Sequence, residues 1–281
     1  MLLEGIETLL VLAQEGTMSK AGSRLYLSQS AVSKRIAKLE QRIGKKLIEP
    51  DGRRIKLTAD ALQLIAAVEP GFKALKGQIF DQLDVNDRTV IHLACSETLV
   101  AGYLAPVMGD YIQHDPYLAI STHHTPIIVE KVQSGDAAVG FCAGHLPPQH
   151  GLAVTHLFDE PFSVVSRERL DQQPSQLLVN DLKNPANANQ VSSLQKAAIA
   201  PYMEMDSYTA AAQLALSGVA AALVPISIVN TLKIAHHHCH HFPFLDELTR
   251  PVQLCYRQSS LQAPRTRKLI ETIAGSVQLT V

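Results

Sequence analysis

Residues 17–44, TMSKAGSRLYLSQSAVSKRIAKLEQRIG, predict two short helices joined by a tight turn. Ser28 is placed to cap the second helix, because its hydroxyl can accept from the unpaired backbone N–H groups of the first turn. Leu27 can pack on Val32 as a hydrophobic staple, so we expect this helix to begin at Gln29. Its apolar residues recur at steps of four, three and four, which gathers them on one stripe: Val32, Ile36, Leu39 and Ile43. The other side of the helix is polar and free for contacts outside the protein.

The flanking sequence completes a recognisable small unit. Further helices are expected over residues 6–15 and 19–25, the first closed by Gly16. After Gly44, short apolar runs at residues 47–48 and 55–57 flank Pro50-Asp51-Gly52, which is the turn chemistry of a hairpin. Residues 1–57 therefore predict a winged helix-turn-helix head.

The charge of the chain is unevenly distributed. Residues 1–57 hold 11 Lys and Arg against 6 Asp and Glu, a net charge of +5, while the remaining 224 residues carry a net charge of −6. A surface helix whose lysines only confer solubility is the ordinary interpretation of an isolated basic helix. Here a cap, a preceding helix and a basic hairpin coincide, which favours a head that binds DNA and a body that does not.

The polar residues of the head divide by their chemistry. The N-terminal end of the second helix of such a motif enters the major groove, where glutamine can bond adenine through N6 and N7. We therefore expect base contacts from a first group, Gln29, Ser30 and Ser33, and we include the capping residue Ser28 among the DNA-binding residues. Cations bind phosphate and supply affinity with little sequence information, and this second group is Lys34, Arg35, Arg53, Arg54 and Lys56.

Residues 9–58 closely resemble the DNA-binding head of LysR-type transcriptional regulators. The resemblance rests on EGTMSKAGSRL, on LSQSAVSKRIAKLEQRIGKKL and on DGRRIKLT. Two positions depart from the family pattern: Pro50 stands where a basic residue is usual before the wing turn, and Ala61 where a glycine usually follows the wing. The first departure puts wing contacts to phosphate in doubt, and neither threatens the fold.

Residues 58–84 predict a linker helix. An apolar seam with heptad spacing begins at Ala61 and continues through five residues that we expect to mediate dimerisation: Ile65, Val68, Phe72, Leu75 and Ile79. The family resemblance implies that this helix pairs antiparallel with its twin. Pro70 lies inside the seam and lacks a backbone donor, so we expect a kink or a break there.

From residue 89 onward, short apolar runs alternate with helical stretches, which predicts βαβ units and a mostly parallel sheet. Expected strands lie at residues 90–95, 117–122, 137–142, 162–166, 220–224 and 252–256, with helices between them at 96–111, 127–134 and 207–217 and a last one at 265–274. The pattern of residues 170–200 predicts no particular element. The overall fold class is thus α/β.

The body, residues 85–281, resembles the effector domain of the same family, which is built like a periplasmic binding protein from two α/β lobes. The similarity rests on LAPVMGDYIQHDPYLAI, VQSGDAAVGF and ALSGVAAALVP, and departs at Ala138, where an acidic residue is common. The resemblance implies a first lobe over about residues 89–154 and 250–281, and a second over about 155–249.

Polar residues just past the expected strand ends are the candidates for an effector cleft. They are Ser96, Thr98, Thr125, Gly144, His145, Asp206 and Ser207. Helix N-termini present free N–H groups and favour negative charge, so we expect a small-molecule effector such as a small organic anion. Ser96 and Ser207 are equally well placed as ordinary N-caps.

Histidine and cysteine could also supply chemistry to this chain. The histidines of residues 236–241 would share helical faces at a spacing of four, but no acidic or cysteine partner is spaced around them, so we expect no metal site and no cofactor. The resemblance also raises a thiol sensor in the second lobe. The absence of cysteine between Cys142 and Cys239 argues against one, and Cys95 and Cys142 are expected to be buried, inert thiols.

The sequence thus predicts a LysR-type regulator that is not an enzyme. It should be a cytoplasmic homodimer or homotetramer with no membrane partner, bound to double-stranded DNA at a pseudo-palindromic operator. The alternative is a solute-binding protein or an enzyme that uses the same α/β body. No Walker loop, GxSxG, HExxH or dinucleotide-binding glycine pattern supports catalysis.

Overall fold

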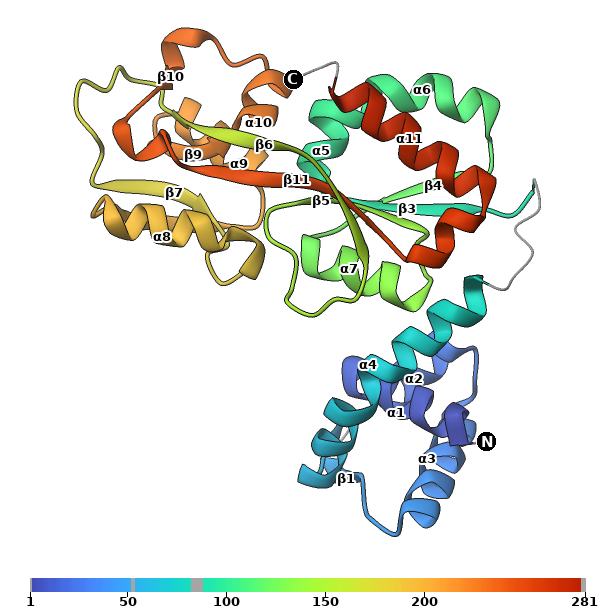
Figure 1. The fold of residues 1–281 in the computed structure, drawn as a ribbon. Helices are drawn as coiled ribbons and strands as arrows, with labels where there is room; N and C mark the ends of the chain where they lie inside the picture. The colour runs from blue at the N-terminus through green and yellow to red at the C-terminus, as the bar shows by residue number, and fades with distance from the viewer. Residues whose placement is uncertain (1, 52–53, 82–87, 279–281) are drawn as a thin grey trace. The chain divides into compact units, whose positions relative to one another are not determined.

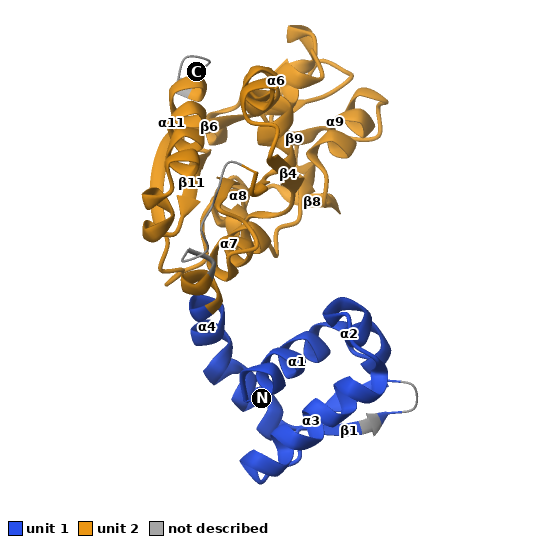
Figure 2. Ribbon diagram, turned by 90° about the vertical axis from the view of Figure 1, so that its right-hand side faces the viewer, with its two compact units in different colours: residues 1–75 blue, residues 76–281 orange. Residues whose placement is uncertain are grey.

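We describe a computed structural model of the chain over residues 2–51, 54–81 and 88–278. The chain divides into two compact units, residues 1–75 and residues 76–281 (Figure 2). No helix in the described part of the chain is both long and apolar enough to cross a membrane. Each unit is described by itself below.

The first unit begins with three helices, α1 (Leu2–Glu15), α2 (Met18–Leu25) and α3 (Gln29–Ile43). Helix α3 starts at Gln29, as predicted, because the backbone N–H of Ala31 donates to the hydroxyl of Ser28 at 3.2 Å. The helices enclose one buried apolar core: Leu9, Leu12, Ala21, Val32, Ile36, Leu39, Leu47 and Ala61. The predicted apolar stripe of α3 therefore packs inward, and its polar side faces outward.

A hairpin follows, formed by β1 (Ile48–Asp51) and β2 (Arg54–Leu57) in antiparallel register. The prediction that Pro50 and Asp51 form the turn is wrong, because both belong to β1 and Asp51 pairs with Arg54. The predicted turn residue Gly52 and the predicted phosphate contact Arg53 lie outside the described residues.

Buried Glu40 fixes the path from α3 into the hairpin. One carboxylate oxygen accepts from the backbone N–H of Leu47 at 2.8 Å, and the other pairs with Lys46 at 3.0 Å. Burial raises the pKa of Glu40, but these hydrogen bonds and the Lys46 charge outweigh it, so that the pKa is lowered overall. The carboxylate stays ionised and satisfies backbone donors that the turn leaves unpaired.

The linker is a single helix, α4 (Ala59–Asp81), and it runs through Pro70 without a break. Of the two alternatives predicted at Pro70, a kink or a break, the break is therefore wrong. Of the predicted seam, Ala61 and Ile65 pack into the core of the head, whereas Leu75 and Ile79 are exposed. The N-terminal end of the seam thus packs into the core of the head, and its C-terminal end leaves apolar side chains exposed.

The second unit is organised on one sheet of nine described strands (Figure 1). Its strands are β3 (Ile91–Cys95), β4 (Leu118–Thr122), β5 (Val139–Ala143), β6 (Ala153–Val165), β7 (Gln176–Asn180), β8 (Ala200–Met205), β9 (Ala222–Pro225), β10 (Cys239–His240) and β11 (Thr249–Tyr256). They run in the order β4-β3-β5-β11-β6-β9-β7-β8, with β10 beside β6. The first lobe holds β3, β4 and β5, and the second holds β7, β8 and β9.

The expectation of a mostly parallel sheet is only half right. Strands β3, β4 and β5 pair in parallel, as do β7, β8 and β9. The two strands between them, β6 and β11, pair antiparallel with each other and with their neighbours. Strand β6 begins at Ala153, nine residues before the strand predicted at 162–166, and it crosses from the first lobe into the second.

Helices cover the sheet in both lobes. In the first lobe, α5 (Glu97–Leu99), the π-helical turn Val100–Leu104 and α6 (Ala105–His114) form a continuous helical run, with α7 (Thr125–Ser134) and α11 (Pro264–Gln278) also on this lobe. The second lobe carries α8 (Ala188–Lys196), α9 (Tyr208–Leu216) and α10 (Ile226–Thr231). Four 3-10 turns, Pro185–Asn187, His236–His238, Pro243–Leu245 and Gln258–Gln262, complete the described elements. Each lobe has its own buried apolar core.

Candidate functional site

The polar side of α3 faces a hollow in the first unit. The hollow has a volume of about 680 Å³ and lies between the start of α2, the side of α3 and the hairpin. Gln29, Ser33 and Arg54 line it together, as do Thr17 and Ser19 at the start of α2. This concave surface brings amide, hydroxyl and guanidinium groups from three elements onto one face.

The other predicted DNA contacts within the described residues do not line that hollow. Ser28, Ser30, Lys34 and Lys56 are exposed, and Arg35 is half-buried. The hydroxyl of Ser28 is engaged as the cap of α3 and lies 2.9 Å from that of Ser30. The first unit therefore presents polar and cationic groups at the N-terminal end of α3 and along the hairpin.

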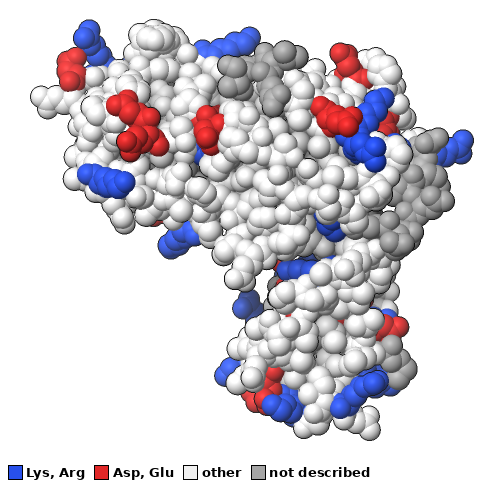
Figure 3. Space-filling view, in the orientation of Figure 1, with Lys and Arg blue, Asp and Glu red and all other residues white. Residues whose placement is uncertain are grey.

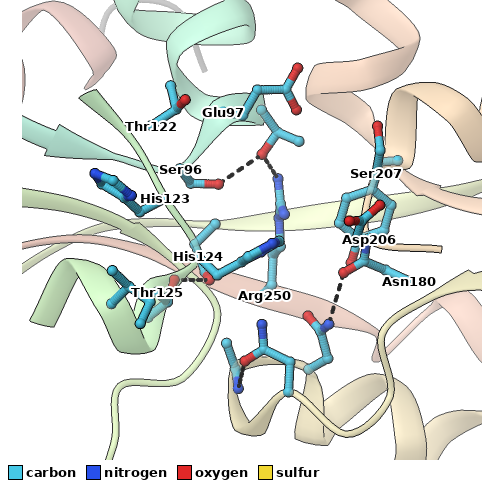
Figure 4. Close-up of a pocket in the computed structure, with 17 residues that line it drawn as sticks. Ser96, Glu97, Thr122, His123, His124, Thr125, Asn180, Asp206, Ser207 and Arg250 are labelled. Atoms are coloured by element: carbon cyan, nitrogen blue, oxygen red, sulfur yellow. Dashed lines mark hydrogen bonds between the residues drawn. The ribbon is translucent and has the colours of Figure 1, made fainter. Parts of the chain in front are cut away.

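A second cavity, of about 430 Å³, lies between the two lobes of the second unit (Figure 4). Arg250 on β11 lies between residues of the first lobe, such as Ser96 and Thr125, and residues of the second, such as Asn180 and Ser207 (Figure 4). The first lobe contributes the start of the α5 helix, the loop after β4 and the start of α7. The second contributes the ends of β7 and β8 and the start of α9.

Arg250 is held by a buried partner, Glu160 on β6. Its Nε and Nη2 atoms lie 2.7 and 2.6 Å from Oε2 of Glu160, and the two residues are 5% and 0% exposed. The other oxygen of Glu160 accepts from the hydroxyl of Tyr103 at 3.1 Å and from the backbone N–H of Ser227 at 2.8 Å. This ion pair therefore ties β6 and β11 to both lobes.

The guanidinium of Arg250 also reaches the cavity. Nη2 donates to the hydroxyl of Thr98 at 2.8 Å, and the group lies over the rings of Phe162 and Tyr208. Tyr208, which also lines the cavity, shares a side-chain hydrogen bond with Arg250. Because Arg250 itself lines the cavity and its guanidinium carries five N–H donors, it can also donate to a bound molecule.

The tyrosines around this ion pair stay protonated. Burial, followed by the charge of Glu160, raises the pKa of Tyr103, and burial is also the largest cause of the raised pKa of Tyr208. Tyr208 accepts a hydrogen bond from Gln190 at 2.6 Å. Both phenols therefore act as neutral hydrogen-bonding groups.

Five of the seven predicted cleft residues line this cavity: Ser96, Thr98, Thr125, Asp206 and Ser207. Ser207 caps α9 by accepting from the backbone N–H of Ala210 at 3.3 Å. Ser96 makes no such cap, and its hydroxyl lies 3.3 Å from that of Thr98. Thr125 is buried and donates to the backbone oxygen of Ala143 at 2.7 Å. The ordinary interpretation as an N-cap thus holds for Ser207 and not for Ser96.

Gly144 and His145 do not line the cavity, so their predicted placement is wrong. The backbone N–H of His145 donates to the backbone oxygen of Ala186 at 3.1 Å, which joins the two lobes beside the cavity. A Cβ on Gly144, whose φ is +88°, would lie 2.3 Å from that same oxygen. The position requires glycine because the second lobe approaches the backbone so closely.

Sequence reasoning missed the centre of the cavity. Arg250 and Glu160 each stand just before a proline, outside the strands expected at residues 162–166 and 252–256, and neither was among the predicted site residues. Their one sequence signal is that each is a charged residue within two residues of an apolar run that forms a buried strand. Asn180, Asn187 and His123 also line the cavity without having been predicted. Burial, followed by the charges of Lys131 and His124, lowers the pKa of His123.

The histidine run does not form the helical face considered from the sequence. His236–His238 is a 3-10 turn, and His240 lies in β10, so a spacing of four residues does not place these rings side by side. His241 pairs with Asp246 at 2.6 Å. Among the described residues, no group of three or more His, Cys, Asp or Glu side chains is arranged to hold a metal ion.

Two of the cysteines meet in the first lobe. The sulfur atoms of Cys142 and Cys255 lie 3.6 Å apart, and both residues are fully buried. Burial, followed by the hydrogen bond to Cys255, raises the pKa of Cys142, and burial raises that of Cys95. The predicted burial of Cys95 and Cys142 is confirmed, and such thiols are poor nucleophiles.

Comparison with known proteins assigns both units to one family. Residues 3–62 match the family described as bacterial regulatory helix-turn-helix protein, lysR family, and residues 86–278 match the LysR substrate binding domain. An uncharacterized HTH-type transcriptional regulator of Vibrio cholerae is 58% identical over 281 residues, which cover 100% of this chain and 98% of that protein. The transcriptional activator AmpR of Pseudomonas aeruginosa is 25% identical over 77% of this chain and 76% of its own.

Solved structures show the same fold at low identity. Full-length OxyR from Pseudomonas aeruginosa has a TM-score of 0.63 and 21% identity, over 99% of this chain and 95% of that one. The LysR family regulator CbnR has a TM-score of 0.61 and 19% identity, over 99% of both chains. Together with the family matches over the head and the body, these findings show that the chain belongs to the LysR family of transcriptional regulators.

Proposed function

We propose that the head reads DNA through the N-terminal half of α3 and that a small molecule in the cleft between the lobes controls this binding. The observation that carries the proposal for the head is the hollow lined by Gln29, Ser33 and Arg54. Gln29 and Ser33 have the chemistry for base edges, with Ser28 and Ser30 beside them. Arg54, with Lys34, Arg35, Arg53 and Lys56, is assigned to phosphate.

Gln29→Ala should relax base preference, whereas Arg54→Ala should weaken all sites alike. The first change removes a base contact worth about 1–3 kcal/mol of discrimination. The second removes a phosphate contact and should lower the magnitude of the salt slope of binding by about 1. Fluorescence anisotropy on a duplex from the gene's own upstream region and on a scrambled duplex measures both effects.

Arg169→Ala is the matched control for Arg54→Ala, because Arg169 is an exposed arginine of the second unit and forms a surface pair with Asp171. It should bind both duplexes as the unaltered protein does. An equal loss on both duplexes for Gln29→Ala would remove Gln29 from the residues that read bases.

For the cleft, we propose an effector that carries both a carboxylate and an amino group. The guanidinium of Arg250 lines the cavity and can donate to a carboxylate, with the hydroxyls of Ser96 and Thr98 nearby. The charge of Arg250 is already compensated by Glu160, and carboxylates of Glu97 and Asp206 also line the cavity. A purely anionic ligand would meet those carboxylates, whereas an amino group on the ligand would pair with one of them. The small organic anion expected from the sequence is thus specified as a carboxylate that also carries an amino group.

A thermal-shift series with the free amino acids, their N-acetyl derivatives and their methyl esters tests this effector class. A ligand that binds only the folded state stabilises it by about 2.7 kcal/mol at one hundred times its Kd, so the melting temperature rises. We expect a free amino acid to raise it and its two derivatives to have little effect. Stabilisation by an N-acetyl derivative equal to that by the parent would contradict the need for an amino group.

Asp206→Asn is the variant for the same series. Asp206 is exposed, and among the described residues its side chain forms no hydrogen bond or ion pair, so the substitution should leave folding intact. It should reduce the shift caused by the amino acid. An unchanged shift would leave Glu97 as the carboxylate that faces the amino group.

The exposed apolar side chains at the C-terminal end of α4 indicate how two copies of the protein associate. We propose that Leu75 and Ile79, together with Val68 and Phe72, pair with a second copy, because exposed apolar side chains at heptad spacing favour helix pairing. Two heads related by a two-fold axis would read a pseudo-palindromic operator in the cytoplasm. We further propose a head of residues 1–57, a linker of 58–84 and an effector domain of 85–281.

A further inference from the structure

Tyr26 combines two properties that a folded chain rarely gives to one aromatic residue. It follows α2 with φ of 55° and ψ of 41°, the left-handed region of the backbone. Its side chain is 96% exposed, although tyrosine usually buries most of its ring. A bulky residue in this conformation is uncommon, and such outliers gather where function requires them.

The turn itself explains the backbone conformation but not the tyrosine. The backbone N–H of Tyr26 donates to the carbonyl oxygens of Gly22 and Ser23, and that of Leu27 donates to Gly22 at 2.8 Å. A left-handed residue at this point ends α2, and glycine or asparagine takes it at least strain. The side chain of Tyr26 contributes little packing in return, because nearly all of it faces solvent.

The position of Tyr26 in the chain places it beside the N-terminal end of α3. Gln29 is three positions further along the chain, so the Cα atoms of the two residues are at most about 11 Å apart. In helix-turn-helix proteins the N-terminal residues of the second helix contact base edges, and the major groove is about 12 Å wide. A residue at this separation from Gln29 is therefore within reach of the phosphates that border the groove while Gln29 contacts a base.

We propose that Tyr26 is a DNA-contacting residue whose hydroxyl donates to a phosphate oxygen beside the half-site read by α3. Tyrosine hydroxyls are among the groups that bind phosphate oxygens in protein–DNA complexes. The proposal rests on the proposed function of α3 in the major groove. Tyr26 thus makes a neutral contact to phosphate in addition to the contacts made by Lys and Arg. This contact supplies affinity and fixes the orientation of the head without reading the base sequence.

Two variants of the full-length protein test the proposal by fluorescence anisotropy on the upstream duplex and on its scrambled counterpart. Tyr26→Phe removes only the hydroxyl and should weaken binding to both duplexes about 3- to 10-fold. Tyr26→Asn should weaken binding at least as much, with a melting temperature no lower than that of the unaltered protein, because asparagine relieves the left-handed strain. The salt slope should be unchanged in both, since no cation is lost.

Lys233→Asn is the control, because Lys233 is also left-handed, with φ of 50°, but lies in the second unit. It should leave DNA binding unchanged. Binding of both Tyr26 variants within about twofold of the unaltered protein would overturn the proposal. A fall in both affinity and melting temperature for Tyr26→Asn, with normal binding by Tyr26→Phe, would also overturn it, since the ring would then be structural. If the unaltered protein binds neither duplex, the proposed function of α3 fails instead.

Discussion

Replacing Glu160 by glutamine should lower the free energy of unfolding of the second unit by about 3–5 kcal/mol, because it leaves the buried charge of Arg250 without its partner. Glutamine keeps the shape of the side chain, so the loss reports charge rather than packing. Glu160 is fully buried and binds Arg250, Tyr103 and the backbone of Ser227 at once. Urea denaturation followed by circular dichroism measures the change.

A double replacement distinguishes the ion pair from the hydrogen bonds around it. Glu160→Leu with Arg250→Met removes both charges and should recover much of the lost stability, since well-packed apolar residues often replace a buried ion pair at no cost. The same double variant should lose the thermal shift caused by an amino acid, because the guanidinium of Arg250 is gone. A Glu160→Gln protein as stable as the unaltered one would show that the pair does not hold the lobes together.

Alanine at position 22 should disrupt the head. A Cβ on Gly22 would lie 2.6 Å from the backbone oxygen of Leu27, and neither α2 nor the turn can yield without moving α3. We expect a loss of about 1–3 kcal/mol in the stability of the head from this overpacking. DNA affinity should fall about tenfold or more, because each misplaced base contact costs about 1–3 kcal/mol.

Gly71→Ala is the matched control for Gly22→Ala. Gly71 is also a glycine inside a helix of the first unit, but a Cβ there has no neighbour within 4 Å. Alanine should therefore stabilise the protein by about 0.5–1 kcal/mol through helix propensity alone. A loss of stability for Gly22→Ala together with a gain for Gly71→Ala would distinguish the close backbone approach at Gly22 from helix propensity. A gain in stability for both variants would contradict the tight turn described at Gly22.

The head was largely predictable because its determinants are local in the sequence. The Ser28 cap, the apolar stripe that includes Val32 and Ile36, and the closing Gly44 each act within a few residues. Local patterns did not predict the structural role of Glu40. Its carboxylate accepts from the backbone N–H groups of Leu47 and Ile48, which approach it only after the chain has turned back. The break considered at Pro70 does not occur, because the loss of one backbone N–H donor does not interrupt α4.

The cleft was less predictable because its centre joins distant parts of the chain. Glu160 and Arg250 are 90 residues apart and meet only when β6 and β11 lie side by side. The acidic residues and proline at 159–161 obscured the length of β6, so that the crossing between lobes was missed. Residues such as Ser96 and Asp206 were predictable, since strand ends in α/β folds gather at one edge.

The charge asymmetry between head and body was visible in composition alone. On the face drawn in Figure 3, acidic and basic side chains of the second unit are interspersed. The net positive charge belongs to residues 1–57. A regulator that contacts DNA through its head alone requires no positive surface on its effector domain.

The most direct test of the account is the salt dependence of binding between the unaltered full-length protein and a duplex from its own upstream region. Anisotropy titrations between about 50 and 200 mM salt should give a dissociation constant that rises steeply with salt, because binding releases counterions from the phosphates. The upstream duplex should also bind more tightly than the scrambled one. Absence of salt-sensitive binding to either duplex, at any protein concentration, would contradict the assignment of the head as the part that reads DNA.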